Sequence, residues 1–204
     1  MKVNELQTSN MTNKERIETA IRHSLETKQL ILNDKQLQER LDQAAGICVQ
    51  ALQNGGKVLF AGNGGSAADA QHLAAELSGR FYYDRPPLNS EALHVNTSYL
   101  TAVANDYSYD EIYARLLLGT AKKGDVLIGL STSGNSKNIV RAFEASKTIG
   151  VTCIAFTGTT GGQMKELADI LINVPSTDTP RIQESHIMLG HILCEIVEAT
   201  IFPR

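Results

Sequence analysis

A strand, a glycine-rich turn and a helix follow one another within residues 57–80, and this arrangement limits most strongly what the chain can fold into. Val58–Ala61 is a short apolar run typical of a buried strand, and Gly62–Ser66 then turns the chain. Ala67–Leu77 contains five alanines and no β-branched residue, which favours a helix. Backbone N–H groups and a serine hydroxyl at a helix start bind anions, most often phosphate. Because the glycine spacing fits neither a Walker loop nor a dinucleotide fingerprint, the segment predicts either a phosphate loop or a plain tight turn.

A second strand–turn–helix unit carries more hydroxyl groups than a turn requires. Asp125–Leu130 has the apolar character of a strand buried on both faces, and a helix is predicted over Lys137–Ile149. Between them, Ser131–Ser136 holds four hydroxyl side chains in six residues. Phosphate oxygens accept hydrogen bonds from hydroxyls and from N–H groups at a helix start, so this loop is predicted to bind phosphate.

The remaining elements alternate between strand and helix, which predicts an α/β fold with a parallel sheet covered on both sides. Further strands are expected at 92–96, 151–156 and 170–174, and further helices at 99–104, 109–121, 163–168 and 181–200, with a polar turn at 105–107. Ligands of such sheets bind beyond the carboxyl ends of the strands, where both loops described above lie.

Two helices are expected before this core. Residues 1–13 are predicted to be frayed, and apolar residues at helical spacing run from Lys14 to an expected break and cap at Asn33-Asp34. A second helix is expected to end at Asn54–Gly56. Their apolar faces are predicted to pack on the main domain and, by our preferred interpretation, on another subunit.

Length, charge and cysteine content set limits on function. The 204 residues fit one domain, and the net charge of −3 gives no electrostatic case for a nucleic-acid or anionic-membrane partner. No apolar run is long enough to span a bilayer, and the polar N-terminus does not resemble a signal peptide. The three cysteines are far apart in apolar contexts, which favours reduced core thiols and a cytoplasmic location.

A few residues on helices are candidates for chemistry. His72 and Glu76 lie one turn apart, and Gln183 and His191 share a face of the last helix, with His186 a competitor for His191. Imidazole favours zinc among the common divalent ions, but spacing alone supports a metal site only weakly. A single His or Glu on a helix is more often a solvated or structural residue.

Three motifs together resemble the sugar isomerase (SIS) family and, within it, the phosphoheptose isomerases: Gly62–His72, Ser131–Ser136 and Arg181–Glu184. The resemblance covers nearly the whole chain. It implies a single SIS domain over 1–204 with a flavodoxin-like, doubly wound, five-stranded parallel sheet. It also implies a homotetramer in which the N-terminal helical extension, residues 14–54, forms a central bundle, while 57–204 bind the sugar phosphate.

The resemblance further implies an aldose–ketose isomerase that converts sedoheptulose 7-phosphate to D-glycero-D-manno-heptose 7-phosphate, the first step toward the heptose of bacterial lipopolysaccharide. One zinc ion per subunit is implied, with His72, Glu76, Gln183 and His191 as ligands. The implied substrate-binding residues, beside Glu76 and Gln183, are Asn63, Gly64, Gly65, Ser66, Asn105, Asp106, Ser131, Thr132, Ser133 and Ser136.

These residue types suit the implied reaction. Isomerisation through an enediolate requires a base that moves a proton between neighbouring carbons and an acid that serves their oxygens. Glu76 is the expected base and His191 the expected acid, and zinc is expected to polarise the same oxygens.

Three alternatives remain at this point. A non-enzymatic relative with the SIS fold binds the bacterial replication initiator, and the ending Ile201–Pro203 resembles that protein. The chain nevertheless keeps Glu76, His191 and Ser133, which that relative is expected to lack. A sugar-phosphate sensor would need a DNA-binding domain, which the sequence does not show. An isomerase for another sugar phosphate would use the same phosphate loops.

Overall fold

The computed structural model describes residues 11–204, and the predicted frayed segment lies mostly outside that range. Within it, Thr12 caps the first helix: its side chain accepts a hydrogen bond from the Glu15 N–H, and the Glu15 carboxylate accepts one from the Thr12 N–H. Such a reciprocal cap fixes the start of a helix. The prediction of fraying is therefore wrong at Thr12 and Asn13.

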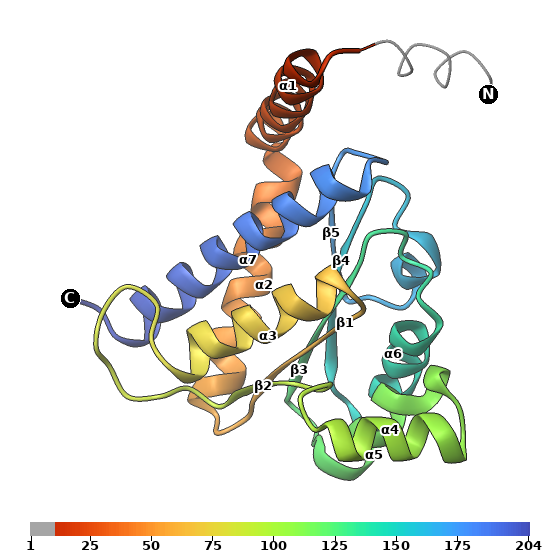
Figure 1. Cartoon of the computed structure of the whole chain (residues 1–204). Coiled ribbons are helices and arrows are strands. Elements are labelled where there is room, and N and C mark those ends of the chain that lie inside the picture. The colour runs from red at the N-terminus through yellow and green to blue at the C-terminus, as the bar shows by residue number, and fades with distance from the viewer. Residues whose placement is uncertain (1–10) are drawn as a thin grey trace.

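The core is a five-stranded parallel sheet in the order β2-β1-β3-β4-β5. Its strands are β1 (Val58–Gly62), β2 (Ser90–Ala92), β3 (Val126–Ser131), β4 (Thr152–Thr157) and β5 (Ile170–Asn173). The central strands β1, β3 and β4 are apolar and almost wholly buried because helices cover both faces. The predicted doubly wound α/β fold is thereby confirmed (Figure 1).

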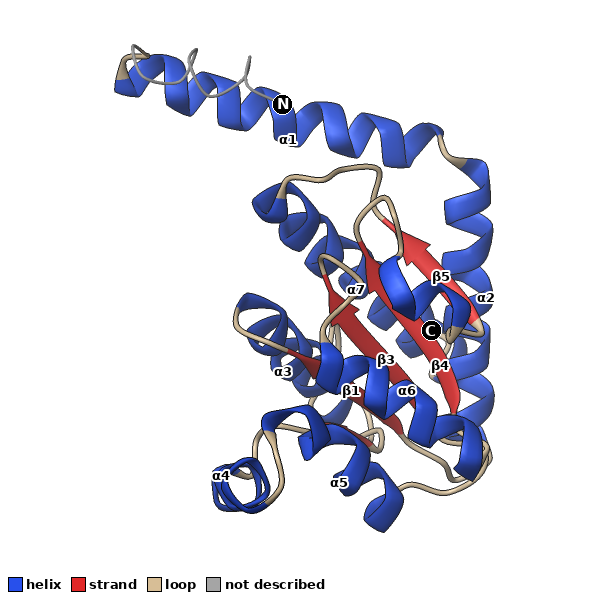
Figure 2. Ribbon diagram, turned by 90° about the vertical axis from the view of Figure 1, so that its right-hand side faces the viewer, coloured by secondary structure: helices blue, strands red, loops and turns tan. Residues whose placement is uncertain are grey.

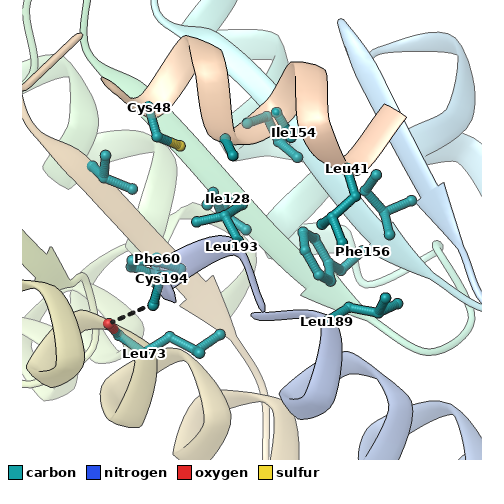
Figure 3. Packing of buried hydrophobic residues seen from close by; sticks show 14 of the residues in the cluster. Leu41, Cys48, Phe60, Leu73, Ile128, Ile154, Phe156, Leu189, Leu193 and Cys194 are labelled. Carbon is teal, nitrogen blue, oxygen red and sulfur yellow. Dashed lines mark hydrogen bonds between the residues drawn. The ribbon is translucent and has the colours of Figure 1, made fainter. Parts of the chain in front are cut away.

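One face of the sheet is covered by three helices, α2 (Lys35–Gln53), α3 (Gly65–Ser78) and α7 (Thr179–Ile201). Their apolar residues form one buried cluster with alternate residues of the central strands, among them Phe60, Ile128 and Phe156. Figure 3 shows Leu41 and Cys48 of α2 meeting Leu193 and Cys194 of α7 over these strand residues.

The opposite face is covered by α4 (Thr97–Asp106), α5 (Ile112–Thr120) and α6 (Lys137–Ile149). The other set of alternate strand residues, Leu59, Leu127 and Cys153 among them, packs there against helical residues such as Phe143. Two 3₁₀ turns, η1 (Tyr109–Glu111) and η2 (Gly162–Glu166), complete this side.

Helix α1 (Asn13–Asn33) extends beyond the sheet, as Figures 1 and 2 show. Asp34 ends α1 and caps α2, accepting a hydrogen bond from the Leu37 N–H, as predicted for this break. An ion pair of 3.3 Å between Lys28 and Glu184 joins α1 to α7. Ile17, Ile21 and Leu25 follow one another at four-residue spacing and are 63%, 57% and 63% exposed, so this stripe has no partner within the described chain.

Two predicted boundaries are wrong for the same physical reason. The strand expected at 92–96 is instead β2 at Ser90–Ala92, because the Asn96 side chain accepts a hydrogen bond from the Tyr99 N–H and caps α4. The polar turn expected at 105–107 is wrong for Asn105 and Asp106, which form the last turn of α4. Polar residues here cap or end a helix rather than separate elements.

Several other predicted elements shift by a few residues. The helix expected at 163–168 is the 3₁₀ turn η2 at 162–166, and the helix expected at 109–121 is divided into η1 and α5. The three cysteines are free and buried, which confirms the prediction of reduced core thiols. Among residues 11–204, no helix combines the length and the apolar character needed to cross a membrane.

Candidate active site

The two predicted phosphate loops leave the sheet side by side. Gly62 at the end of β1 pairs with Leu130 near the end of β3, so the loops that follow both strands meet at one edge. In this strand order β2 is added on one side of β1 and β3 to β5 on the other, so the switch point lies between β1 and β3, which is where ligands of doubly wound sheets bind. The sequence prediction about where the loops lie is confirmed.

Both helix starts at this edge are free of side-chain caps. Gly64 precedes α3 and Ser136 precedes α6, and neither provides a capping hydrogen bond. Each α-helix leaves its first N–H groups without an intrahelical partner, and the helix dipole adds positive potential there. Two uncapped helix starts beside each other form a site suited to an anion such as phosphate.

The hydroxyl loop, Ser131–Ser136, is held by contacts within it and with the η2 segment. Ser131 Oγ and Ser136 Oγ lie 2.8 Å apart, and Asn135 Oδ1 accepts a hydrogen bond from the Gln163 N–H. Gly134 has φ of +67°, and a Cβ there would lie 2.1 Å from the Gly161 carbonyl oxygen, so only glycine fits. Thr132 and Ser133 line a hollow of about 270 Å³ at the same edge.

Three side chains from α3 and α7 converge into one group. The Nε2 atoms of His72 and His191 lie 2.9 Å apart, and His72 Nε2 lies 3.2 Å from Glu76 Oε1. The potential ligand atoms of all three residues lie within 4.8 Å of one another. The structure thus brings together three of the four predicted metal ligands, which are separated by up to 119 residues in the sequence.

The geometry of this group suits a zinc ion. Two imidazole nitrogens and one carboxylate oxygen are a common catalytic zinc set. With metal–ligand distances near 2.0–2.2 Å, tetrahedral ligand atoms lie about 3.3–3.6 Å from one another. The separations of 2.9 and 3.2 Å observed here are slightly shorter than this range, and the third lies within 4.8 Å, so small side-chain movements would admit the ion. The donor set therefore fits the implied ion.

Gln183, the fourth predicted ligand, lies near the start of α3. A Cβ built on Gly65 would lie 2.6 Å from Gln183 Nε2, so the amide packs directly on that glycine and excludes a larger residue. Gly65 and His72 are seven residues apart on α3, while Gln183 and His191 are eight apart on α7. The two helices therefore run side by side in the same direction, and the metal role of Gln183 stays a prediction.

The structure separates His186 from this group. His186 is fully buried, and its Nε2 lies 3.0 Å from the Thr157 carbonyl oxygen. Burial lowers its pKa to about 4, although the hydrogen bond to Thr157 acts in the opposite direction. It is therefore a neutral core residue, and His191 is the histidine that meets His72.

Within the described chain, the other predicted substrate-binding residues make no hydrogen bond or ion pair with the group formed by His72, Glu76 and His191. Asn105 and Asp106 are exposed at the end of α4, and Asn105 Nδ2 donates a hydrogen bond of 2.9 Å to Asp106 Oδ1. Ser66, in contrast, is buried in the first turn of α3. The substrate contacts of all these residues stay predictions.

Sequence reasoning missed two polar residues of the site. Asp69 lies one turn before His72 on α3, and this i,i+3 spacing was a signal for it. Partial burial raises the pKa of Asp69, and the nearby His72 and His191 act to lower it. Asn138, in the first turn of α6, is buried and bonded to Asn63. No local pattern marks it, because its partner is 75 residues away.

Comparison with known proteins gives consistent matches. The family model for the SIS domain matches residues 25–158. Phosphoheptose isomerase of Aneurinibacillus thermoaerophilus is 51% identical over 186 residues, covering 91% of this chain and 94% of the relative. A solved phosphoheptose isomerase from Francisella tularensis is similar with a TM-score of 0.88 at 36% identity, covering 92% of this chain and 98% of that one. The corresponding structure from Neisseria gonorrhoeae has a TM-score of 0.87 at 41% identity, covering 92% and 100%.

Proposed function

The chain belongs to the phosphoheptose isomerases of the SIS family, and from this membership we propose how its residues carry out the reaction. The reaction is the aldose–ketose isomerisation of sedoheptulose 7-phosphate to D-glycero-D-manno-heptose 7-phosphate, the first step of heptose biosynthesis. The observation that carries the assignment of roles is the convergence of His72, Glu76 and His191 beside two uncapped helix starts.

Glu76 is the proposed base and His191 the proposed acid. Glu76 takes a proton from C1 of the ketose, beside the C2 carbonyl, and returns it to C2 through an enediolate. His191 gives a proton to the C2 oxygen and then takes the proton that the C1 hydroxyl loses, so His191 and Glu76 both return to their starting states. The short contacts of both residues with His72 support their acting on the same two carbons.

His72, Glu76 and His191, together with Gln183, are the residues proposed to hold one zinc ion. When bound, zinc would polarise the oxygens on C1 and C2 and stabilise negative charge on them. The proton transfers themselves are assigned to the side chains of this chain.

The phosphate is proposed to bind between the two loops, at Gly64–Ser66 and at the hydroxyls of Ser131, Thr132, Ser133 and Ser136. Gly65 and His72 are seven positions apart on α3, which corresponds to a rise of about 10 Å along the helix axis. An extended seven-carbon sugar can bridge such a distance, whereas a three-carbon sugar cannot. The spacing along α3 thus supports a long substrate with its phosphate at the helix start.

We propose that the protein is a homotetramer located in the cytoplasm. The exposed stripe on α1 and an apolar groove of about 550 Å³ between α1, α2 and α7 support contact with further copies through the N-terminal helices, residues 14–54. The buried free cysteines support a reducing compartment.

The test is turnover of sedoheptulose 7-phosphate by the purified protein, with and without a chelator. Glu76→Gln is expected to lower kcat by at least about 10²-fold, because general base catalysis contributes about 10²–10⁴-fold. Glu39→Gln is the matched control, since Glu39 is exposed on α2. Near-normal turnover by the Glu76 variant would remove Glu76 as the base, and activity unaffected by complete metal removal would remove zinc from the reaction.

A further inference from the structure

The two phosphate loops are joined by a pair of side-chain amides. Asn63 Nδ2 donates to Asn138 Oδ1 at 2.8 Å, and Asn138 Nδ2 donates to Asn63 Oδ1 at 2.8 Å. Asn63 follows β1, and Asn138 lies in the first turn of α6 after β3. Asn138 is 2% exposed, so the pair is screened from water on that side.

A third side chain binds the same amide. Tyr109 Oη donates to Asn63 Oδ1 at 3.0 Å, and Tyr113 Oη donates to the neighbouring Gly62 carbonyl oxygen. The Asn63 oxygen therefore accepts two hydrogen bonds, which fills both of its lone pairs. Its nitrogen has donated one of two N–H groups, so one N–H remains for another partner.

Building on the proposed function, we propose that Asn138 is a positioning residue that links the two loops and turns the free N–H of Asn63 toward the sugar phosphate. With its oxygen occupied by Asn138 and Tyr109, Asn63 recognises the substrate as a donor alone. Donors at this position favour a ligand rich in acceptor oxygens, such as a phosphate ester. Tyr109 holds the amide from the solvent side.

An asparagine at position 138 has to match the amide of Asn63 on one side and the hydroxyl loop, which is proposed to bind phosphate, on the other. An apolar residue at position 138 would remove one hydrogen bond from the side-chain nitrogen of Asn63 and one from its side-chain oxygen. A carboxylate would have nearly the same shape, yet it would oppose the Asn63 oxygen and place a negative charge beside the phosphate loop. The amide of asparagine both donates to and accepts from Asn63, and it carries no charge.

The first experiment compares steady-state kinetics of Asn138→Asp with the wild type. We expect KM for sedoheptulose 7-phosphate to rise about 30-fold or more with kcat within about 3-fold, because a charged mismatch costs more than one neutral hydrogen bond. The inhibition constant of inorganic phosphate should rise in parallel. An unchanged KM and phosphate affinity in a folded variant would overturn the proposal.

Tyr109→Phe tests the same link at a half-exposed position where folding is not at risk. Loss of one donor to Asn63 is expected to raise KM about 3- to 10-fold without lowering the melting temperature. Tyr107→Phe is the matched control, because Tyr107 contacts Arg115 through its ring and phenylalanine keeps that contact. Equal KM values for the Tyr109 and Tyr107 variants would contradict the proposal, even if Asn138→Asp failed to fold.

Thermal stabilisation by inorganic phosphate separates this proposal from the proposed function. If the wild type lacks isomerase activity but phosphate stabilises it less in both Asn138 and Tyr109 variants, the loop linkage stands and the isomerase assignment fails. If the wild type is active and neither variant changes phosphate binding, the isomerase assignment stands and the linkage fails.

Discussion

At the scale of single residues, His186 shows how burial decides protonation. Its Nε2–H donates to the Thr157 carbonyl, and its Nδ1 has no partner among the described residues. A neutral ring tolerates one unpaired nitrogen better than a charged ring tolerates the loss of water. The low pKa of His186 is therefore a property of its place between α7 and β4.

This predicts a pH-dependent loss of stability. The unfolded chain binds a proton at this histidine as the pH falls below about 6.5, whereas the native state stays neutral until about 4. The free energy of unfolding should fall across that window by up to about 3 kcal/mol and then level. Urea unfolding of His186→Gln should show a flatter pH profile than that of the wild type. His23→Gln, which alters an exposed histidine of α1, should keep the wild-type slope; identical profiles for the two variants would contradict this account.

At the scale of elements, a buried ion pair fixes the end of α3. Arg85 donates to the carbonyl oxygens of Glu76, Leu77 and Gly79, which the helix leaves without intrahelical partners. Glu198 of α7 accepts from Arg85 at 2.9 Å and from the N–H groups of Phe81 and Tyr82. The pair thus ties α3, α7 and the segment between them into one unit.

Removing one partner should therefore be costly. Glu198→Met is expected to lower the free energy of unfolding by about 3–5 kcal/mol, because it leaves a buried guanidinium without its counter-charge. Arg85→Met should cost a similar amount, and the double variant should cost less than the sum. Urea unfolding measures all three, with the exposed Glu195→Gln as control. Strictly additive losses would show that the two side chains do not interact.

At the scale of the whole molecule, α1 gives the chain an apolar surface that its own core does not use. Ile17, Ile21 and Leu25 would expose their side chains to water in a monomer, which is unfavourable for a stripe of this length. Burial of such side chains contributes about 1.5–3 kcal/mol each, which favours the proposed assembly.

Ile21→Asp together with Leu25→Asp should therefore reduce the oligomeric state of the protein. Analytical ultracentrifugation should show smaller species for this double variant, while circular dichroism keeps its helical signal. Glu18→Gln with Glu26→Gln changes exposed polar residues of the same helix and should leave the sedimentation coefficient unchanged. A wild type that sediments as a monomer would refute the assembly itself.

Prediction from sequence succeeded where a local signal decides the structure. Helix α6 is predicted at 137–149 and occupies that range, because Ser136 and Gly150 mark the two ends of a strongly amphipathic segment. Strand β2 was misplaced because the capping of α4 by Asn96 competes with strand formation. The Asn63–Asn138 pair was beyond prediction, since the sheet alone brings those residues together. The meeting of His72 and His191 was expected only through the family resemblance.

The division of the reaction centre between α3 and α7 also has a consequence for biosynthesis. The ribosome releases both phosphate loops well before it releases α7, which carries His191. A nascent chain that lacks α7 also lacks Leu189, Leu193 and Val197, which complete the buried cluster on that face of the sheet. Premature termination before α7 should therefore yield a chain that neither folds nor converts substrate, so folding and catalysis both wait for the last helix.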